Sequence, residues 1–126
     1  LQADLQQACE GRARFHSPGW QARGLLHHWD ILLYRNPQLP ESFGRVAAES
    51  LRAGCIPVVD DLGGFREIVT PATGCLCRTL PEFTAVLAQL HDVALRQAYA
   101  RAARAHGDDQ FSLAGFQQRL LSTWLD

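Results

Sequence analysis

The sequence has 126 residues, a formal net charge of −1 and an apolar fraction of 47%, which suits a single domain with one buried core. The near-neutral charge argues against a nucleic acid partner, because nucleic acids are held by clustered positive charge. No apolar run approaches the roughly 18 residues of a membrane span and no signal-peptide pattern is present, so we expect a cytoplasmic protein without a membrane span.

The first half of the chain is predicted to alternate short helices with short strands. Residues 2–10 predict a helix, residues 12–16 a weak alternating strand and residues 20–28 a second helix. Residues 30–34 and 55–59 are short and almost continuously apolar. Because these two runs do not alternate with polar residues, they favour strands that are covered on both faces, as in a parallel sheet.

A helix is predicted between those two strands, over residues 41–53. Pro40 precedes it, apolar residues recur at helical spacing from Phe43 onwards, and Gly54 stands where a helix cap is expected. A strand, a helix and a strand within about thirty residues form a βαβ unit, in which the two strands are parallel.

The second half of the chain is predicted to be mainly helical. Residues 60–64 predict a turn, residues 65–69 one helical turn and residues 74–77 a last short strand. From residue 81 to residue 126 the pattern is helical, with a break near residues 107–109. The fold class is therefore α/β with a helical C-terminal tail.

Two groups of side chains outside the strands invite a functional interpretation. The aromatic stripe of Phe111, Phe116 and Trp124 is expected to serve packing rather than base stacking. Cys75 and Cys77 permit a metal site, but neither a second cysteine pair nor a histidine at zinc-finger spacing accompanies them. The favoured interpretation is that the cysteines are small buried thiols beside strands, and no metal is expected.

The segment between residues 40 and 59 carries the most informative motif. Seven residues separate Glu41 from Glu49, and a Ser-Phe-Gly sequence directly follows Glu41. The further positions of the ordered set are Gly54, Pro57, Val58, Val59, Gly63, Gly64, Glu67, Ile68, Val69 and Gly74. This set resembles the C-terminal nucleotide-binding domain of retaining glycosyltransferases with the GT-B fold, the large family 4 group.

The expected local structure of the motif also suits an anionic ligand. The segment runs from a strand through a loop to a helix N-terminus, so the unpaired amides of Phe43, Gly44 and Arg45 would point at a diphosphate. Gly44 has no side chain to block close approach. A carboxylate accepts two hydroxyl hydrogen bonds well, so glutamate suits the vicinal hydroxyls of a ribose or a hexose.

The resemblance implies a role for each residue of the motif. Glu41 would contact the hydroxyls of the donor sugar and is the catalytic candidate, and Glu49 would contact the ribose. The donor-binding candidates are Glu41, Ser42, Phe43, Gly44, Arg45, Val46 and Glu49. Neither a metal ion nor another cofactor is implied. Spacing alone favours a simpler explanation, in which Glu41 pairs with Arg45 and Glu49 pairs with Arg52 as ordinary helical ion pairs; the surrounding motif reverses that preference.

The resemblance also implies that parts of the enzyme lie outside this sequence. No segment corresponds to the acceptor-binding N-terminal domain, or to the two strands whose Arg/Lys pair neutralises the leaving diphosphate. We therefore expect residues 1–126 to be one partial domain with a partial Rossmann-like parallel sheet, inactive alone. The missing domain is expected in the same gene product or in a partner chain. Residues 12–16 would be separated from residues 30–34 by the two missing strands.

Three functions remain open at this stage. The first is the donor-binding part of a retaining glycosyltransferase that transfers a hexose from a nucleoside diphosphate sugar. The second is a non-catalytic module that binds a sugar nucleotide or a protein, and the third is an epimerase of the same two-domain architecture. The two glutamates together with the Ser-Phe-Gly sequence favour the first. The sequence does not identify the nucleotide, the donor sugar or the acceptor.

Overall fold

The structure, a computed structural model, describes residues 1–125. Its centre is a sheet of three parallel strands in the order β1-β2-β3. The strands are β1 (Ile31–Tyr34), β2 (Ile56–Asp60) and β3 (Cys75–Cys77). Ile31 lies opposite Ile56, and Val58 lies opposite Cys75. The three strands and their parallel order confirm the predicted α/β fold with a partial Rossmann-like sheet.

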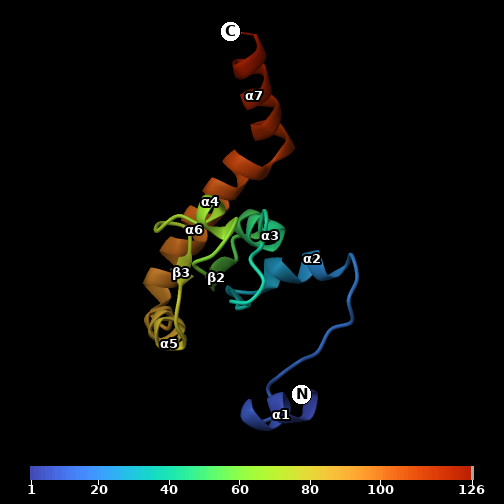
Figure 1. Ribbon diagram of the computed structural model, residues 1–126, viewed down its shortest axis with the longest axis vertical. Coiled ribbons are helices and arrows are strands. Elements are labelled where there is room, and N and C mark those ends of the chain that lie inside the picture. The colour runs from blue at the N-terminus through green and yellow to red at the C-terminus, as the bar shows by residue number, and fades with distance from the viewer. Residues whose placement is uncertain (126) are drawn as a thin grey trace.

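Helices surround this sheet and also extend well beyond it (Figure 1). They are α1 (Gln2–Ala8), α2 (Ala22–Leu25) with the 3₁₀ turn η1 (Leu26–His28), α3 (Arg45–Ala53), α4 (Phe65–Ile68), α5 (Leu80–Gln89), α6 (Val93–Phe111) and α7 (Leu113–Trp124). In Figure 1, α1 and α7 lie at opposite ends of the molecule, and a long stretch without helix or strand joins α1 to α2. None of the helices within residues 1–125 has both the length and the apolar character needed to cross a membrane.

The core lies on both faces of the central strand β2, all five residues of which are buried. Ile56 and Val58 face a cluster that contains Phe83 of α5, whereas Val59 packs with α3, α4 and α6 through a second cluster. Successive strand residues point to opposite faces, so a continuous apolar run fits a strand with helices on each side. This arrangement is the one predicted from the run at residues 55–59.

The helix of the βαβ unit begins later than the sequence pattern indicates. The prediction of a helix from residue 41 is wrong, because α3 starts at Arg45 and Gly44 is its N-cap, with φ at +83°. A left-handed residue cannot continue a helix, so residues 41–44 form a turn instead. Phe43 consequently lies outside the helix with 56% of its surface exposed, although the spacing assigned it to the apolar face.

The predicted strand at residues 12–16 is also wrong. The segment has no helix or strand assignment and lies away from the sheet, between α1 and α2 (Figure 1). Its alternating pattern contains only Ala13 and Phe15 as apolar residues, and a strand needs a neighbour to pair its backbone groups. The separation of this segment from residues 30–34 agrees with the expectation that the two do not pair.

The break predicted near residues 107–109 does not occur there. Gly107 lies inside α6 and is buried, and a Cβ atom at this position would lie 2.5 Å from the backbone of Leu51 in α3. Glycine at this point therefore lets two helices approach closely rather than ending one. The break falls at Ser112, whose side chain accepts a 3.0 Å hydrogen bond from the amide of Gly115 and so caps α7.

The last helix, α7, has no buried residue. Phe111, at the end of α6, packs against the core, but Phe116 and Trp124 are 55% and 79% exposed. The prediction that these three aromatic residues serve packing is therefore wrong for the two in α7. In Figure 1 the helix projects from the body beyond the end of α6.

Candidate functional site

A hollow of about 500 Å³ opens beside the N-terminus of α3. We call it the motif hollow; its lining residues are Glu41, Ser42, Phe43, Gly44, Arg45, Val46 and Glu49. These are the residues that the sequence nominated as donor-binding candidates. Although the two glutamates are not on one helix, the turn at residues 41–44 and the first turns of α3 bring both to the same hollow.

Glu41 is held in place through both its side chain and its backbone. The phenol of Tyr34, at the end of β1, donates a 3.0 Å hydrogen bond to Oε1 of Glu41. The pKa of Tyr34 is raised, first by this hydrogen bond and then by burial. The carbonyl oxygen of Glu41 accepts a 2.7 Å hydrogen bond from the amide of Gly64. The carboxylate therefore has a fixed position at the carboxyl end of the sheet.

The turn after β2 packs tightly against the turn that carries Glu41. A Cβ atom on Gly63 would overlap the carbonyl oxygen of Glu41, and one on Gly44 would lie 2.7 Å from the ring of Phe65. The two loops can therefore touch only because these positions lack side chains. Asp60, buried at the end of β2, adds a further tie by accepting a hydrogen bond from the amide of Asn36.

Glu49, on the second turn of α3, is held differently, by two arginines. Nη2 of Arg23 lies 3.1 Å from Oε1 of Glu49, and Nε of Arg45 lies 3.5 Å from the same oxygen. The guanidinium of Arg23 also stacks 4.5 Å above the ring of Trp20. The side chain of Glu49 remains 27% exposed, so the carboxylate is accessible to a ligand as well as paired.

The N-terminus of α3 presents backbone donors to the hollow. The carbonyl oxygen of Gly44 accepts from the amides of Ala47 and Ala48, at 2.9 and 3.3 Å. The amides of Arg45 and Val46 precede this first helical bond and have no intrahelical acceptor. The sequence placed the available amides at residues 43–45; the later start of the helix moves them to Arg45 and Val46.

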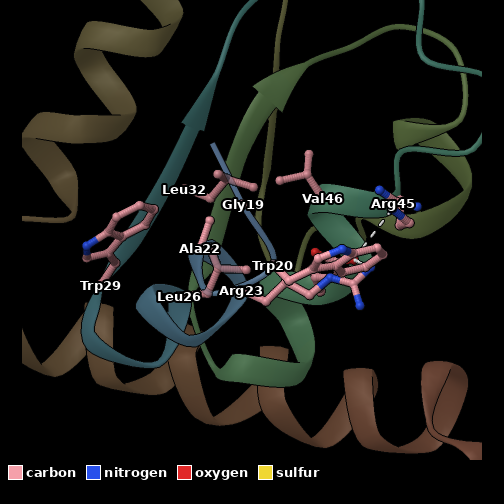
Figure 2. A pocket seen from close by; sticks show the side chains of 10 residues that line it. Gly19, Trp20, Ala22, Arg23, Leu26, Trp29, Leu32, Arg45 and Val46 are labelled. Atoms are coloured by element: carbon pink, nitrogen blue, oxygen red, sulfur yellow. Dashed lines mark ion pairs between the residues drawn. The ribbon is translucent and has the colours of Figure 1, made fainter. Parts of the chain in front are cut away.

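Two more hollows meet the motif hollow at Arg45 and Glu49. One, of about 440 Å³, lies between α2 and α3; it is the α2–α3 hollow, and its lining includes Trp20, Arg23 and Leu26. Figure 2 shows Trp20, Arg23 and Arg45 gathered at one side of it, with Trp29 at the other. The other, of about 670 Å³, lies between α3 and the junction of α6 with α7. An elongated ligand can therefore extend from the motif hollow along α3.

Sequence reasoning missed two residues of the site. Tyr34 ends an apolar strand that leads to the motif, so its position at the carboxyl end of that strand is a signal that could have found it. Arg23 has no such signal, because its distance from Glu49 depends on how α2 folds back onto α3.

The four cysteines lie apart from the motif hollow. No group of three or more histidine, cysteine, aspartate or glutamate side chains within residues 1–125 is arranged to hold a metal ion. All four cysteines are free thiols. Burial raises the pKa of Cys55 to about 12 and that of Cys77 to about 11, so both stay protonated at neutral pH. The favoured interpretation of buried thiols thus holds for these two.

The chain matches no model of a protein family and no curated protein. It does match solved structures of HepE from Anabaena. The crystal structure of HepE in complex with UDP-glucose has a TM-score of 0.77 at 23% sequence identity. The complexes of HepE with UDP and glucose, and with UDP, have TM-scores of 0.78 and 0.76 at 23% and 24% identity. Each match covers 97% of this chain but only 34% of HepE, so the chain has the fold of about a third of that protein.

Proposed function

We propose that this chain is the donor-binding part of a retaining glycosyltransferase of the GT-B type, which transfers a hexose from a nucleoside diphosphate sugar to an acceptor. The observation that carries the proposal is the motif hollow: all seven candidate residues line it. The shared fold with HepE, whose structures are of complexes with UDP-glucose, UDP and glucose, and UDP, supports the same ligand class.

The order of groups along the chain corresponds to the order of groups in such a ligand. Glu41 comes first, the free amides of Arg45 and Val46 come next, and Glu49 lies one turn further along α3. A nucleotide sugar likewise places its hexose, its diphosphate and its ribose in succession. In this alignment Glu41 binds the hexose hydroxyls and Glu49 binds the ribose hydroxyls, and the helix N-terminus binds the diphosphate.

The helix N-terminus would also assist the departure of the nucleoside diphosphate. Negative charge grows on the diphosphate as its bond to the hexose breaks, and fixed amide dipoles stabilise that charge without reorganising. Arg45 adds a positive charge beside these amides, and its side chain is 75% exposed, which leaves it free to turn towards a phosphate. Glu41, fixed by Tyr34, is the catalytic candidate because it would contact the reacting hexose.

The proposal includes a second domain, in the same gene product or in a partner chain. It would supply the acceptor site and the positive charges that the resemblance assigns to missing strands. The span of only a third of HepE supports this, as does the apolar face of α7, which the described chain leaves uncovered. The same face favours the second candidate, a non-catalytic interaction module. The hollow with its two carboxylates argues against a module that binds only a protein, because such a module needs no diol-binding residues, and a turnover assay separates the transferase part from a module that binds a sugar nucleotide without catalysis.

Titration calorimetry with UDP and UDP-glucose, on the protein with its second domain present, tests the proposal. Glu49→Ala is expected to lower the affinity for both ligands by about ten- to a hundredfold. The substitution removes hydrogen bonds to a charged acceptor that are worth about 1.5–3 kcal/mol. Glu41→Gln is expected to lower the affinity for UDP-glucose while leaving the affinity for UDP nearly unchanged. Arg104→Ala, an exposed arginine on α6 that pairs with Asp108 and lines none of the three hollows, is the matched control. Wild-type affinity of both glutamate variants for both ligands would refute the proposal.

The expected absence of a metal is tested on the same samples. Elemental analysis of the purified chain should show no stoichiometric zinc, and a chelator should leave the affinity for UDP unchanged. Zinc that is lost on substitution of Cys75 or Cys77 would contradict this expectation.

A further inference from the structure

We propose that Arg23 is a positioning residue for Glu49, and that the selectivity of the site for ribose hydroxyls depends on this arginine outside the motif. The inference rests on the proposed function, because it assumes that Glu49 binds the ribose hydroxyls. The inference gives α2, which lies outside the motif and outside α3, a role in ligand selectivity.

Two arginines contact the same oxygen of the Glu49 carboxylate. Both Arg23 and Arg45 approach Oε1, at 3.1 and 3.5 Å. The recorded contact of each arginine is to Oε1, and within residues 1–125 Oε2 accepts no hydrogen bond. An anchored Oε1 fixes the plane of the carboxylate, and Oε2 keeps its lone pairs for a hydroxyl donor. The pairing thus orients Glu49 without occupying it fully.

The position of Arg23 is itself fixed from two directions. Its guanidinium stacks on Trp20 at 4.5 Å, a contact that restrains a long and otherwise mobile side chain. Leu26, which follows α2 and is 5% exposed, anchors this segment beside α3. Arg23 therefore approaches Glu49 from a different element of the fold, across the α2–α3 hollow shown in Figure 2.

Arg45 cannot take the place of Arg23 when a ligand is bound. It lies one turn before Glu49 on α3, and 75% of its side chain is exposed. A diphosphate at the N-terminus of α3 offers Arg45 more negative charge than a single carboxylate does. Arg45 would then turn to the phosphates, and Arg23 would remain as the partner that holds Glu49.

The test measures how well the site distinguishes ribose hydroxyls. Titration calorimetry compares UDP with 2′,3′-dideoxy-UDP, which lacks both hydroxyls, and the ratio of the two dissociation constants is the readout. Wild type should prefer UDP by about tenfold or more. Arg23→Ala should reduce this ratio several-fold through weaker UDP binding, with dideoxy-UDP unchanged. Arg23→Lys should restore part of it, and Arg104→Ala, outside the three hollows, should keep the wild-type ratio.

The outcomes separate this inference from the proposed function. If Glu49→Ala removes the preference for UDP but Arg23→Ala and Arg23→Lys retain it, Arg23 does not position Glu49 and the proposed function stands. If Arg23→Ala weakens both ligands equally, its role is structural and the inference is wrong. If the protein with its second domain present binds neither ligand, or Glu49→Ala keeps the preference, the proposed function fails and the inference fails with it.

Discussion

The middle of the molecule and its two terminal helices all contain apolar side chains, but only the middle of the molecule buries them. The buried apolar residues all lie between Leu26 and Ala103, in what we call the central body, residues 26–111. The terminal helices α1 and α7 have no buried residue. The exposed apolar side chains of α7 are Leu113, Phe116, Leu120, Leu121 and Trp124.

This contrast shows that apolar content alone does not locate a core. The helices α3 and α6 of the central body stabilise each other through close packing at Gly107 and Ala103. An amphipathic helix gains most of its stability from such contacts rather than from its own propensity. Neither terminal helix buries a residue within residues 1–125, so their apolar faces are available to another domain or chain.

The strongest test of the contrast is the removal of an aromatic ring from each region. Phe65 is 2% exposed, packs edge-on against Tyr34 at 5.4 Å and fills the space beside Gly44. Phe65→Ala should lower the free energy of unfolding by about 3–5 kcal/mol, because a cavity replaces the ring. Phe116→Ala in α7 should change it by less than about 0.5 kcal/mol. Urea denaturation followed by circular dichroism measures both, and equal losses would show that α7 is packed after all.

The next test compares two helical glycines. A Cβ at Gly107 would meet the backbone of Leu51 and Arg52 at 2.5 Å, whereas nothing lies within 4 Å of one at Gly24. Gly107→Ala should destabilise the central body by about 1–3 kcal/mol through overpacking. Gly24→Ala should be neutral or stabilising by up to about 1 kcal/mol, since alanine favours the helix. A loss of unfolding free energy in Gly24→Ala comparable to that in Gly107→Ala would contradict the view that Gly24 is free of close contacts.

A smaller effect, dependent on pH, is expected at the turn that follows β2. Arg66 and Arg78 hold Asp61 at 2.7 Å and 2.5 Å, and their hydrogen bonds lower the pKa of its carboxyl below 3.8. A lowered folded-state pKa stabilises the fold above the unfolded value and loses that contribution as the pH falls through the folded value. Asp61→Asn should therefore be less stable than wild type at pH 7, and the gap should narrow as the pH falls through the lowered pKa of Asp61. Denaturation midpoints measured at pH 7 and over a series of acidic pH values check this.

The smallest effect should come from the face of α7 itself. Leu121 is 56% exposed, so Leu121→Ser removes no buried contact and should shift the free energy of unfolding by less than about 0.5 kcal/mol. The measurement is the same urea titration, with Leu51→Ala in the central body as the contrasting variant, since Leu51 is fully buried. A large loss at Leu121 would contradict the division into packed and unpacked regions.

Sequence patterns predicted the central body well because its elements follow local rules. The run at residues 55–59 became a strand buried on both faces, and the spacing within residues 45–53 became a helix that ends at Gly54. The errors fall where a partner decides the outcome. Residues 12–16 lack a neighbouring strand, and Gly107 serves the approach of another helix rather than a chain break.

The candidate site divides in the same way. Its seven predicted residues are nearly contiguous, so the motif in the sequence was enough to nominate them together. Tyr34 and Arg23, which hold the two glutamates, come from β1 and α2. Their contributions depend on the register of the sheet and on the path of the chain before it, neither of which is expressed in local spacing.

The close contact between Gly63 and Glu41 has a consequence for protein engineering. A binding site of this kind cannot be transplanted as a single peptide, because the first glutamate takes its position from the turn after the following strand. A graft onto another parallel sheet would have to carry both loops, including Gly44 and Gly63. It would also need a strand that ends in a tyrosine, as β1 ends in Tyr34. The smallest unit that keeps Glu41 in this position is therefore the pair of neighbouring strands with α3 between them and the turns at their carboxyl ends.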